Sequence, residues 1–249
     1  MFVLAVVAGR AGGSATRLGD EATRFTLSAP GLLGVAFVDA AVLAGVTVVA
    51  ARRMGGSLRE RLRLGPSRAT PLGVLAAIVA VLGLSLAGGA AADLLSVGHG
   101  GVMESIASAL RSSSPPRVLL ALLAIGAAPA VAEEGFFRGL VLTRLTARWP
   151  RGPAIATSAA AFGLFHVDPV QGSLAFAAGL LLGWLADRFG SIRPTIVAHA
   201  VNNATFVLVA SLAAGHEHGT TAAAAGVGGA IVCATCILCL RSGWAVRAA

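Results

Sequence analysis

Two adjacent carboxylates and an arginine interrupt a long apolar run in the middle of this chain. Glu133, Glu134 and Arg138 lie within residues 131–142, and the sequence from Val118 to the end of this stretch is otherwise apolar. A charged side chain at the centre of a lipid bilayer costs about 2.5–3.5 kcal/mol even on the lenient scales. Charged side chains inside a membrane are therefore usually paired with other groups and usually functional. This stretch is therefore the first candidate for a functional site.

The composition predicts a membrane protein. Of the 249 residues, 56% are hydrophobic and only 12% are charged, whereas soluble domains carry about 25% charged residues. Apolar runs of about 20 residues, the length that crosses a bilayer as a helix, recur along the chain. The alternating pattern of barrel strands is absent. We therefore expect an all-α fold, a polytopic transmembrane helical bundle.

Seven spans are predicted, and their order agrees with the positions of the arginines. All 19 basic residues are arginine, and most lie in the loops between apolar runs. By the positive-inside rule these loops face the cytoplasm, which puts the N-terminus outside and the C-terminus inside. This topology accounts for the net charge of +8, so no nucleic-acid partner is expected. The arginine bias suggests a GC-rich bacterium and its inner (cytoplasmic) membrane. The expected spans are 32–51, 71–97, 117–142 with an extension to 149, 153–166, 173–186, 194–213 and 221–240.

The charges of the third span can separate into two groups. Glu134 and Arg138 are four residues apart, so they can pair along one helix face. Glu133 lies about 100° away around the same helix and can point elsewhere. One carboxylate can thus be neutralised in place while the other remains free for chemistry.

Two further spans carry polar residues at compatible depths. His166 ends the fourth span, and His199 and Asn203 share a face of the sixth. At ~1.5 Å per residue these groups and Glu133 lie roughly 13–23 Å from the cytoplasmic ends of their helices. They can therefore meet near the middle of the bilayer.

This set of side chains allows two kinds of hydrolytic chemistry. A buried Glu beside a neutral His can activate water, and a second His with an Asn amide can stabilise an oxyanion. Alternatively Glu133, His166 and His199 could bind zinc and leave one position open for water. Spacing alone does not choose between them. Each residue taken alone could also be a structural tie between helices.

Taken together these residues resemble the three motifs of the CPBP family, which comprises CAAX prenyl proteases and bacteriocin-processing intramembrane endopeptidases. The motifs are Glu133-Glu134-x-x-x-Arg138, Phe162-x-x-x-His166 and His199-x-x-x-Asn203, and the resemblance covers residues 117–213. It implies an intramembrane endopeptidase that cuts a membrane-associated peptide or protein.

The resemblance also implies a role for each motif residue. Glu133 would be the general base and His166 its partner in activating water. His199 and Asn203 would form the oxyanion site. Three further residues would support the site and orient the substrate, namely Glu134, Arg138 and Phe162. No cofactor or metal is expected, with zinc on Glu133, His166 and His199 as the alternative.

The chain is expected to comprise four segments. Residues 1–30 form an N-terminal lead at the membrane interface, and 31–116 form accessory transmembrane helices. Residues 117–213 form the CPBP-type catalytic helical core, and 214–249 a C-terminal transmembrane helix.

Two alternatives from other functional classes remain open. A non-catalytic scaffold or bacteriocin-immunity protein could keep the same fold and bind a peptide. A proton-coupled carrier could use the same carboxylates and histidines, but carriers are commonly built from two similar halves, and no repeat is found here.

Overall fold

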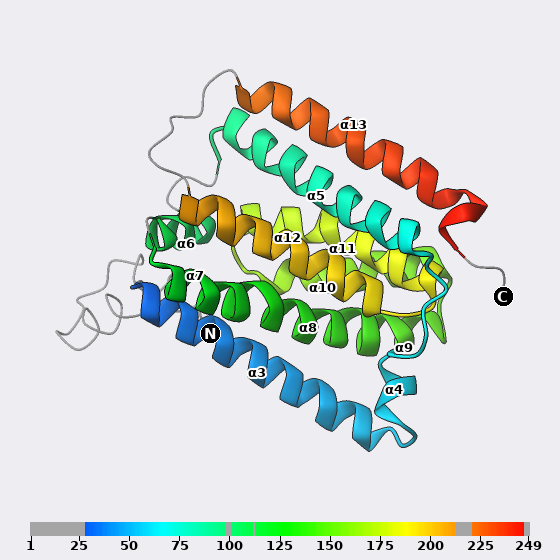
Figure 1. The fold of residues 1–249 in the computed structure, drawn as a ribbon. Coiled ribbons are helices and arrows are strands. Elements are labelled where there is room, and N and C mark those ends of the chain that lie inside the picture. Colours follow the sequence, from blue (N-terminus) through cyan, green and yellow to red (C-terminus); the bar gives the residue numbers. More distant parts are fainter. Residues whose placement is uncertain (1–27, 98–100, 112, 213–220, 247–249) are drawn as a thin grey trace.

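The computed structural model describes residues 28–97, 101–111, 113–212 and 221–246, and helices make up almost all of these ranges (Figure 1). Within them the chain forms no named strand; a single antiparallel bridge joins Ala69 and Val246. The predicted helical fold is confirmed. Most of the expected N-terminal lead, residues 1–27, and the loop at 213–220 lie outside the described residues.

In the ranges that the structure describes, six helices are long and apolar enough to cross a membrane. They correspond to six of the predicted spans. The remaining one, α10 (Arg151–Phe165), has 15 residues, fewer than the ~20 that a crossing helix needs. The six helical segments are α3 (Ala29–Arg53), α5 (Pro71–Leu94), the segment Pro115–Thr146, α11 (Pro169–Phe189), α12 (Arg193–Leu212) and α13 (Thr221–Arg241).

The starts of three helices follow from their sequences. The side chains of Ser28, Thr70 and Asp168 accept hydrogen bonds from the first-turn backbone N–H groups of α3, α5 and α11. A proline follows each of these caps within the first turn, where its missing N–H has no helical partner to lose. The chain therefore turns at 168 and starts a new helix there.

The helices form successive layers across the molecule. In Figure 1, α13 and α5 lie along one side, α10, α11 and α12 in the middle, and the segment Pro115–Thr146 with α3 on the opposite side. A Cβ added at Gly83 of α5 would lie 2.7 Å from the carbonyl oxygen of Gly229 in α13. Small residues thus let α5 and α13 pack at backbone distance, as in many membrane helix pairs.

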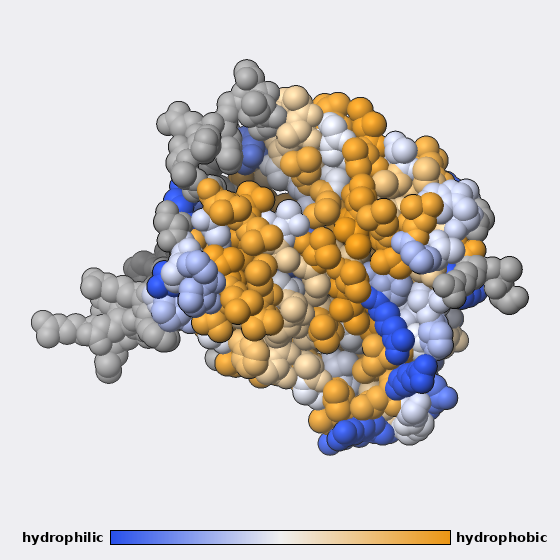
Figure 2. Space-filling model, viewed as in Figure 1, coloured by the Kyte–Doolittle hydropathy of each residue, from blue (hydrophilic) through white to orange (hydrophobic). Residues whose placement is uncertain are grey.

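The arginine-rich loops gather at one end of the bundle. Asp187 lies 3.4 Å from Arg151 and 3.9 Å from Arg63, measured between side-chain nitrogen and oxygen atoms. Arg188 donates to the carbonyl of Arg241 at 3.0 Å. Figure 2 shows hydrophobic residues over the middle of the visible face and hydrophilic ones toward its ends. This distribution is that of a bundle with an apolar belt and polar ends, as the predicted topology requires.

The segment Pro115–Thr146 is not a regular α-helix. It passes through α7 (Pro115–Ala121), the π-helix η1 (Leu122–Ala127), α8 (Ala128–Glu133), the π-helix η2 (Glu134–Leu142) and α9 (Thr143–Thr146). Wider π turns within α-helices are frequent at functional sites. The first charged motif lies where α8 changes into η2.

Candidate active site

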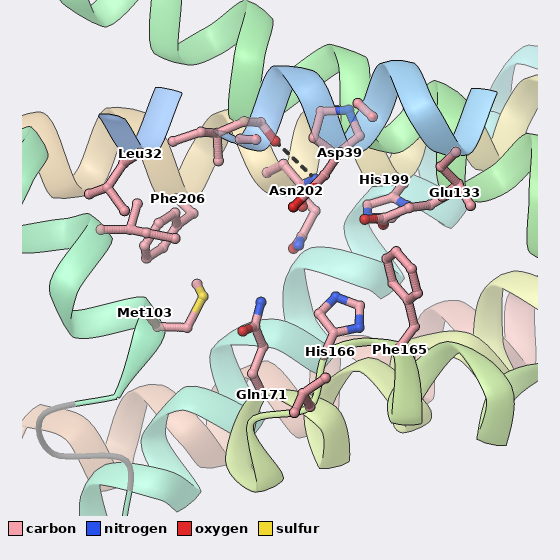
Figure 3. A pocket seen from close by; sticks show the side chains of 18 residues that line it. Leu32, Asp39, Met103, Glu133, Phe165, His166, Gln171, His199, Asn202 and Phe206 are labelled. Carbon is pink, nitrogen blue, oxygen red and sulfur yellow. Dashed lines mark hydrogen bonds and ion pairs between the residues drawn. The ribbon is translucent and has the colours of Figure 1, made fainter. Parts of the chain in front are cut away.

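Four of the predicted site residues line one cavity of about 280 Å³. Glu133 and His199 lie on one side of it, and His166 with Phe165 lies on the opposite side (Figure 3). Asn203 also lines it. Residues from three separate helical segments, Pro115–Thr146, α10 and α12, therefore meet at one place, as the depth estimate suggested. The supporting residues Glu134, Arg138 and Phe162 are buried behind this lining.

A fully buried ion pair supports the cavity wall. Arg138 Nη1 lies 2.8 Å from Glu134 Oε1, and the two side chains are 1% and 0% exposed. The guanidinium carbon also lies 4.2 Å from the centre of the Phe162 ring, which adds a cation–π contact. Arginine remains charged in proteins, so Glu134 is held as a carboxylate. The i, i+4 pairing expected from the sequence is present.

The same carboxylate fixes the orientation of His199. His199 Nδ1 lies 3.1 Å from Glu134 Oε1. Because an ionised carboxylate only accepts, Nδ1 carries the hydrogen and donates it. The other ring nitrogen, Nε2, is thereby turned toward Glu133, at 3.6 Å from Oε2. This distance is longer than a hydrogen bond, so Nε2 is not committed to Glu133.

The two adjacent glutamates consequently have different environments. Glu134 is enclosed, whereas the side chain of Glu133 is 14% exposed and lines the cavity. If His199 carries two hydrogens, its positive charge and that of Arg138 balance the two carboxylates. The cluster can therefore hold an imidazolium without a net charge in a medium that penalises one.

His166 is held from the opposite wall. Its Nδ1 lies 2.9 Å from the carbonyl oxygen of Phe162. A carbonyl only accepts, so Nδ1 donates and Nε2 is left as the reactive nitrogen. The Phe162 ring meets the imidazole edge to face, with centroids 4.8 Å apart. These contacts set both the tautomer and the angle of the ring.

The residue after His166 is strained. Val167 has φ of +60°, in the left-handed region, which is a costly conformation for a β-branched residue. It links the end of α10 to the Asp168 cap of α11. Two helix ends therefore fix the position of His166.

Asn203 is positioned by an irregularity in the neighbouring helix. Pro129 has no N–H to donate to the carbonyl of Ile125, four residues earlier. Asn203 Nδ2 donates to that carbonyl at 3.3 Å. The amide has a second hydrogen, and the side chain lines the cavity, so one donor remains for another acceptor.

Comparison with known families decides what kind of protein this is. Residues 115–205 match the family model described as type II CAAX prenyl endopeptidase Rce1-like. The matched segment contains all three motifs. This segment is the core of a CPBP-family intramembrane endopeptidase. No curated protein and no solved structure matches the chain.

With six apolar helices, the endopeptidase is an integral membrane protein, and its family acts on membrane-associated protein substrates. The sequence interpretation missed part of its cavity wall. Asp39 was assigned no role, and α3 was expected to be accessory, yet Leu32 and Asp39 line the cavity. Asn202 and Gln171 contribute two more polar side chains. The spacing of cavity-facing residues along α3 was visible in the sequence, but it does not say which helix that face meets.

The alternative zinc ligands of the endopeptidase are not gathered into a ligand set. In the part of the chain that the structure describes, no three His, Cys, Asp or Glu side chains come close enough to hold a metal ion. Glu133 and His199 lie together, whereas His166 is across the cavity (Figure 3).

Proposed function

We propose that the endopeptidase hydrolyses a peptide bond of a membrane-associated substrate with a water molecule activated by Glu133 and His166. The observation that carries this proposal is the opposed position of the two side chains across one cavity. A water between them can give its proton to the Glu133 carboxylate. His166 Nε2, free because Nδ1 is bound to the Phe162 carbonyl, can accept the second hydrogen and orient the water.

The attack places negative charge on the substrate carbonyl oxygen. Asn203 has one N–H left after its bond to Ile125. When both of its ring nitrogens carry hydrogen, His199, which lies between Glu133 and Glu134, can donate a second hydrogen bond from Nε2. Two fixed donors in a site of low dielectric stabilise such an oxyanion. Protonated Glu133 then returns its proton to the leaving amine.

The buried residues Glu134, Arg138 and Phe162 orient the two catalytic histidines. Glu134 and Arg138 hold the His199 tautomer, and Phe162 holds both Arg138 and His166. We propose that the reaction needs no cofactor, with a zinc-dependent version as the alternative, and that the protein resides in a bacterial inner membrane.

The test is proteolysis in reconstituted vesicles with a library of membrane-tethered peptides. Wild type, Glu133→Gln, His166→Ala and the control Asp93→Asn, which lies outside the cavity, are compared with and without a zinc chelator. We expect each catalytic variant to lose about 10²–10⁴-fold in rate, the usual contribution of general acid–base catalysis. The chelator should have no effect.

Other results would contradict the proposal in distinct ways. Loss of activity on chelation and its recovery with zinc would establish a metal mechanism. Equal cutting by all four proteins would identify a contaminant. A wild type that binds peptides from the library but cleaves none would favour the scaffold or immunity protein.

A further inference from the structure

Asp39 faces the cavity rather than the lipid. It belongs to a stripe on α3, spaced by three or four residues, whose members all line the cavity: Leu32, Ala36, Asp39 and Leu43. Residues of α3 outside this stripe are apolar and exposed, with Phe37, Val38 and Val42 each more than half exposed. The carboxylate is therefore directed inward by the rotation of its helix.

Asp39 is also deep in the membrane. It lies 13 residues before Arg52 and 11 after Ser28 in the numbering, which corresponds to roughly 20 Å and 16 Å along a helix. In the described parts of the chain it makes no hydrogen bond or ion pair. A charge at this depth is costly unless something compensates it. At a cavity wall, a bound substrate can do so.

Asp39 lies in the middle of the cavity, between a polar end and an apolar end. Glu133 and His199 lie at one end, with His166 on the opposite wall nearer the middle, and Leu32, Phe206 and Met103 lie at the other end (Figure 3). Between them lie Asp39, Asn202 and Gln171. An extended peptide whose scissile bond is at the catalytic end would place a neighbouring residue beside this polar middle section.

The charge of the cavity lining indicates which substrate residue fits beside Asp39. Among the described residues, the cavity wall contains the carboxylates of Asp39 and Glu133 and no arginine. The buried Arg138 is already paired with Glu134. A neutral or acidic substrate residue would leave the Asp39 carboxylate without a partner, whereas a lysine or arginine would pair with it in a medium of low dielectric.

We propose that Asp39 determines substrate specificity by binding a basic side chain close to the scissile bond, with Asn202 and Gln171 as polar neighbours. This inference rests on the proposed function, because it assumes that peptide cleavage takes place at the Glu133 end of the cavity. It adds a preferred substrate chemistry to that reaction.

The test compares peptides that differ in one residue. A membrane-tethered peptide cleaved by the wild type is prepared with lysine or glutamine at each position on both sides of the scissile bond. We expect one position at which the lysine peptide exceeds its glutamine counterpart at least about tenfold in kcat/KM, mainly through KM. This ratio should fall to about one in Asp39→Asn, stay above one in Asp39→Glu, and remain at the wild-type value in Asp93→Asn.

The ratio separates specificity from a structural role. If Asp39→Asn lowered cleavage of both peptides and left their ratio unchanged, Asp39 would be structural and the inference wrong. Absence of a lysine preference at every position in the wild type would also overturn it. If Asp39→Asn cuts too slowly, the same ratio is measured as peptide binding in a Glu133→Gln background. Failure of the proposed function itself appears separately, as undiminished cleavage by Glu133→Gln.

Discussion

The buried carboxylate of Glu134 interacts with several partners at once. Glu134 bonds Arg138 and His199 through the same oxygen, and Arg138 lies over the Phe162 ring. Oε2 of Glu134 and Nη2 of Arg138 have no hydrogen-bond partner within the described residues. The pair is therefore only partly compensated, and its retention is better explained by the histidine that it orients than by stability alone.

Loss of one member of this pair should be more harmful than loss of both. We expect Arg138→Met to destabilise the folded protein by about 3–5 kcal/mol, because it leaves a buried carboxylate unpaired. The double variant Glu134→Gln with Arg138→Met should be less destabilised than Arg138→Met. Denaturant unfolding in detergent micelles measures both values. A double variant at least as unstable as the single one would contradict this account.

The helix that carries Glu133 is irregular close to this residue. Pro129 and the π-helices η1 and η2 interrupt the third span next to Glu133. The carbonyl of Ile125, which Pro129 cannot satisfy, is bound by Asn203. One defect in a helix thus fixes a side chain from another helix, and the fixed side chain lines the cavity.

Asn203 and Pro129 should consequently be coupled. Asn203→Ala removes the side-chain hydrogen bond to the Ile125 carbonyl, and we expect a loss of about 0.6–1.7 kcal/mol, the range of polar contacts between membrane helices. In a Pro129→Ala background the new N–H can bind Ile125, so the same change should cost less. A double-mutant cycle on unfolding free energies gives the coupling. Equal costs in both backgrounds would show that the two residues are independent.

At the scale of the whole molecule, the α5–α13 layer contributes no residue to the cavity lining among the described residues. It packs against α11 and α12, which do line the cavity. Its closeness depends on Gly83 and Gly229, whose backbones are in contact. The neighbouring α12 carries His199 and also packs against α5. Stability of this outer layer therefore supports the helix that holds the site.

Gly83→Ala should destabilise the protein by about 1–3 kcal/mol, the usual cost of overpacking. The added Cβ would lie 2.7 Å from the Gly229 carbonyl oxygen and 3.0 Å from the Cys233 backbone nitrogen. Gly89→Ala on the same helix is the matched control, because nothing lies within 4 Å of its added Cβ. The thermal unfolding temperatures of the two variants in detergent give the comparison. A control that is as unstable as Gly83→Ala would attribute the effect to helix α5 itself rather than to its contact with α13.

The sequence predicted those features that depend on one helix at a time. Span positions follow from length and apolarity, and the Glu134–Arg138 pair follows from a spacing of four. The contact of His199 with both glutamates and the entry of Asp39 into the cavity could not be predicted, since they depend on how separate helices rotate against each other. The π-helices also escaped prediction, although Pro129 was a signal of irregularity at this depth.

The shortness of α10 has a consequence for the surrounding lipid. Its 15 residues extend ~22 Å, about 8 Å less than a typical hydrocarbon core, and His166 caps its inner end. A bilayer adapts to a short hydrophobic segment by becoming thinner beside it. We therefore expect the hydrocarbon layer to be thinner beside His166, so that water has a shorter apolar path to the bond being cut.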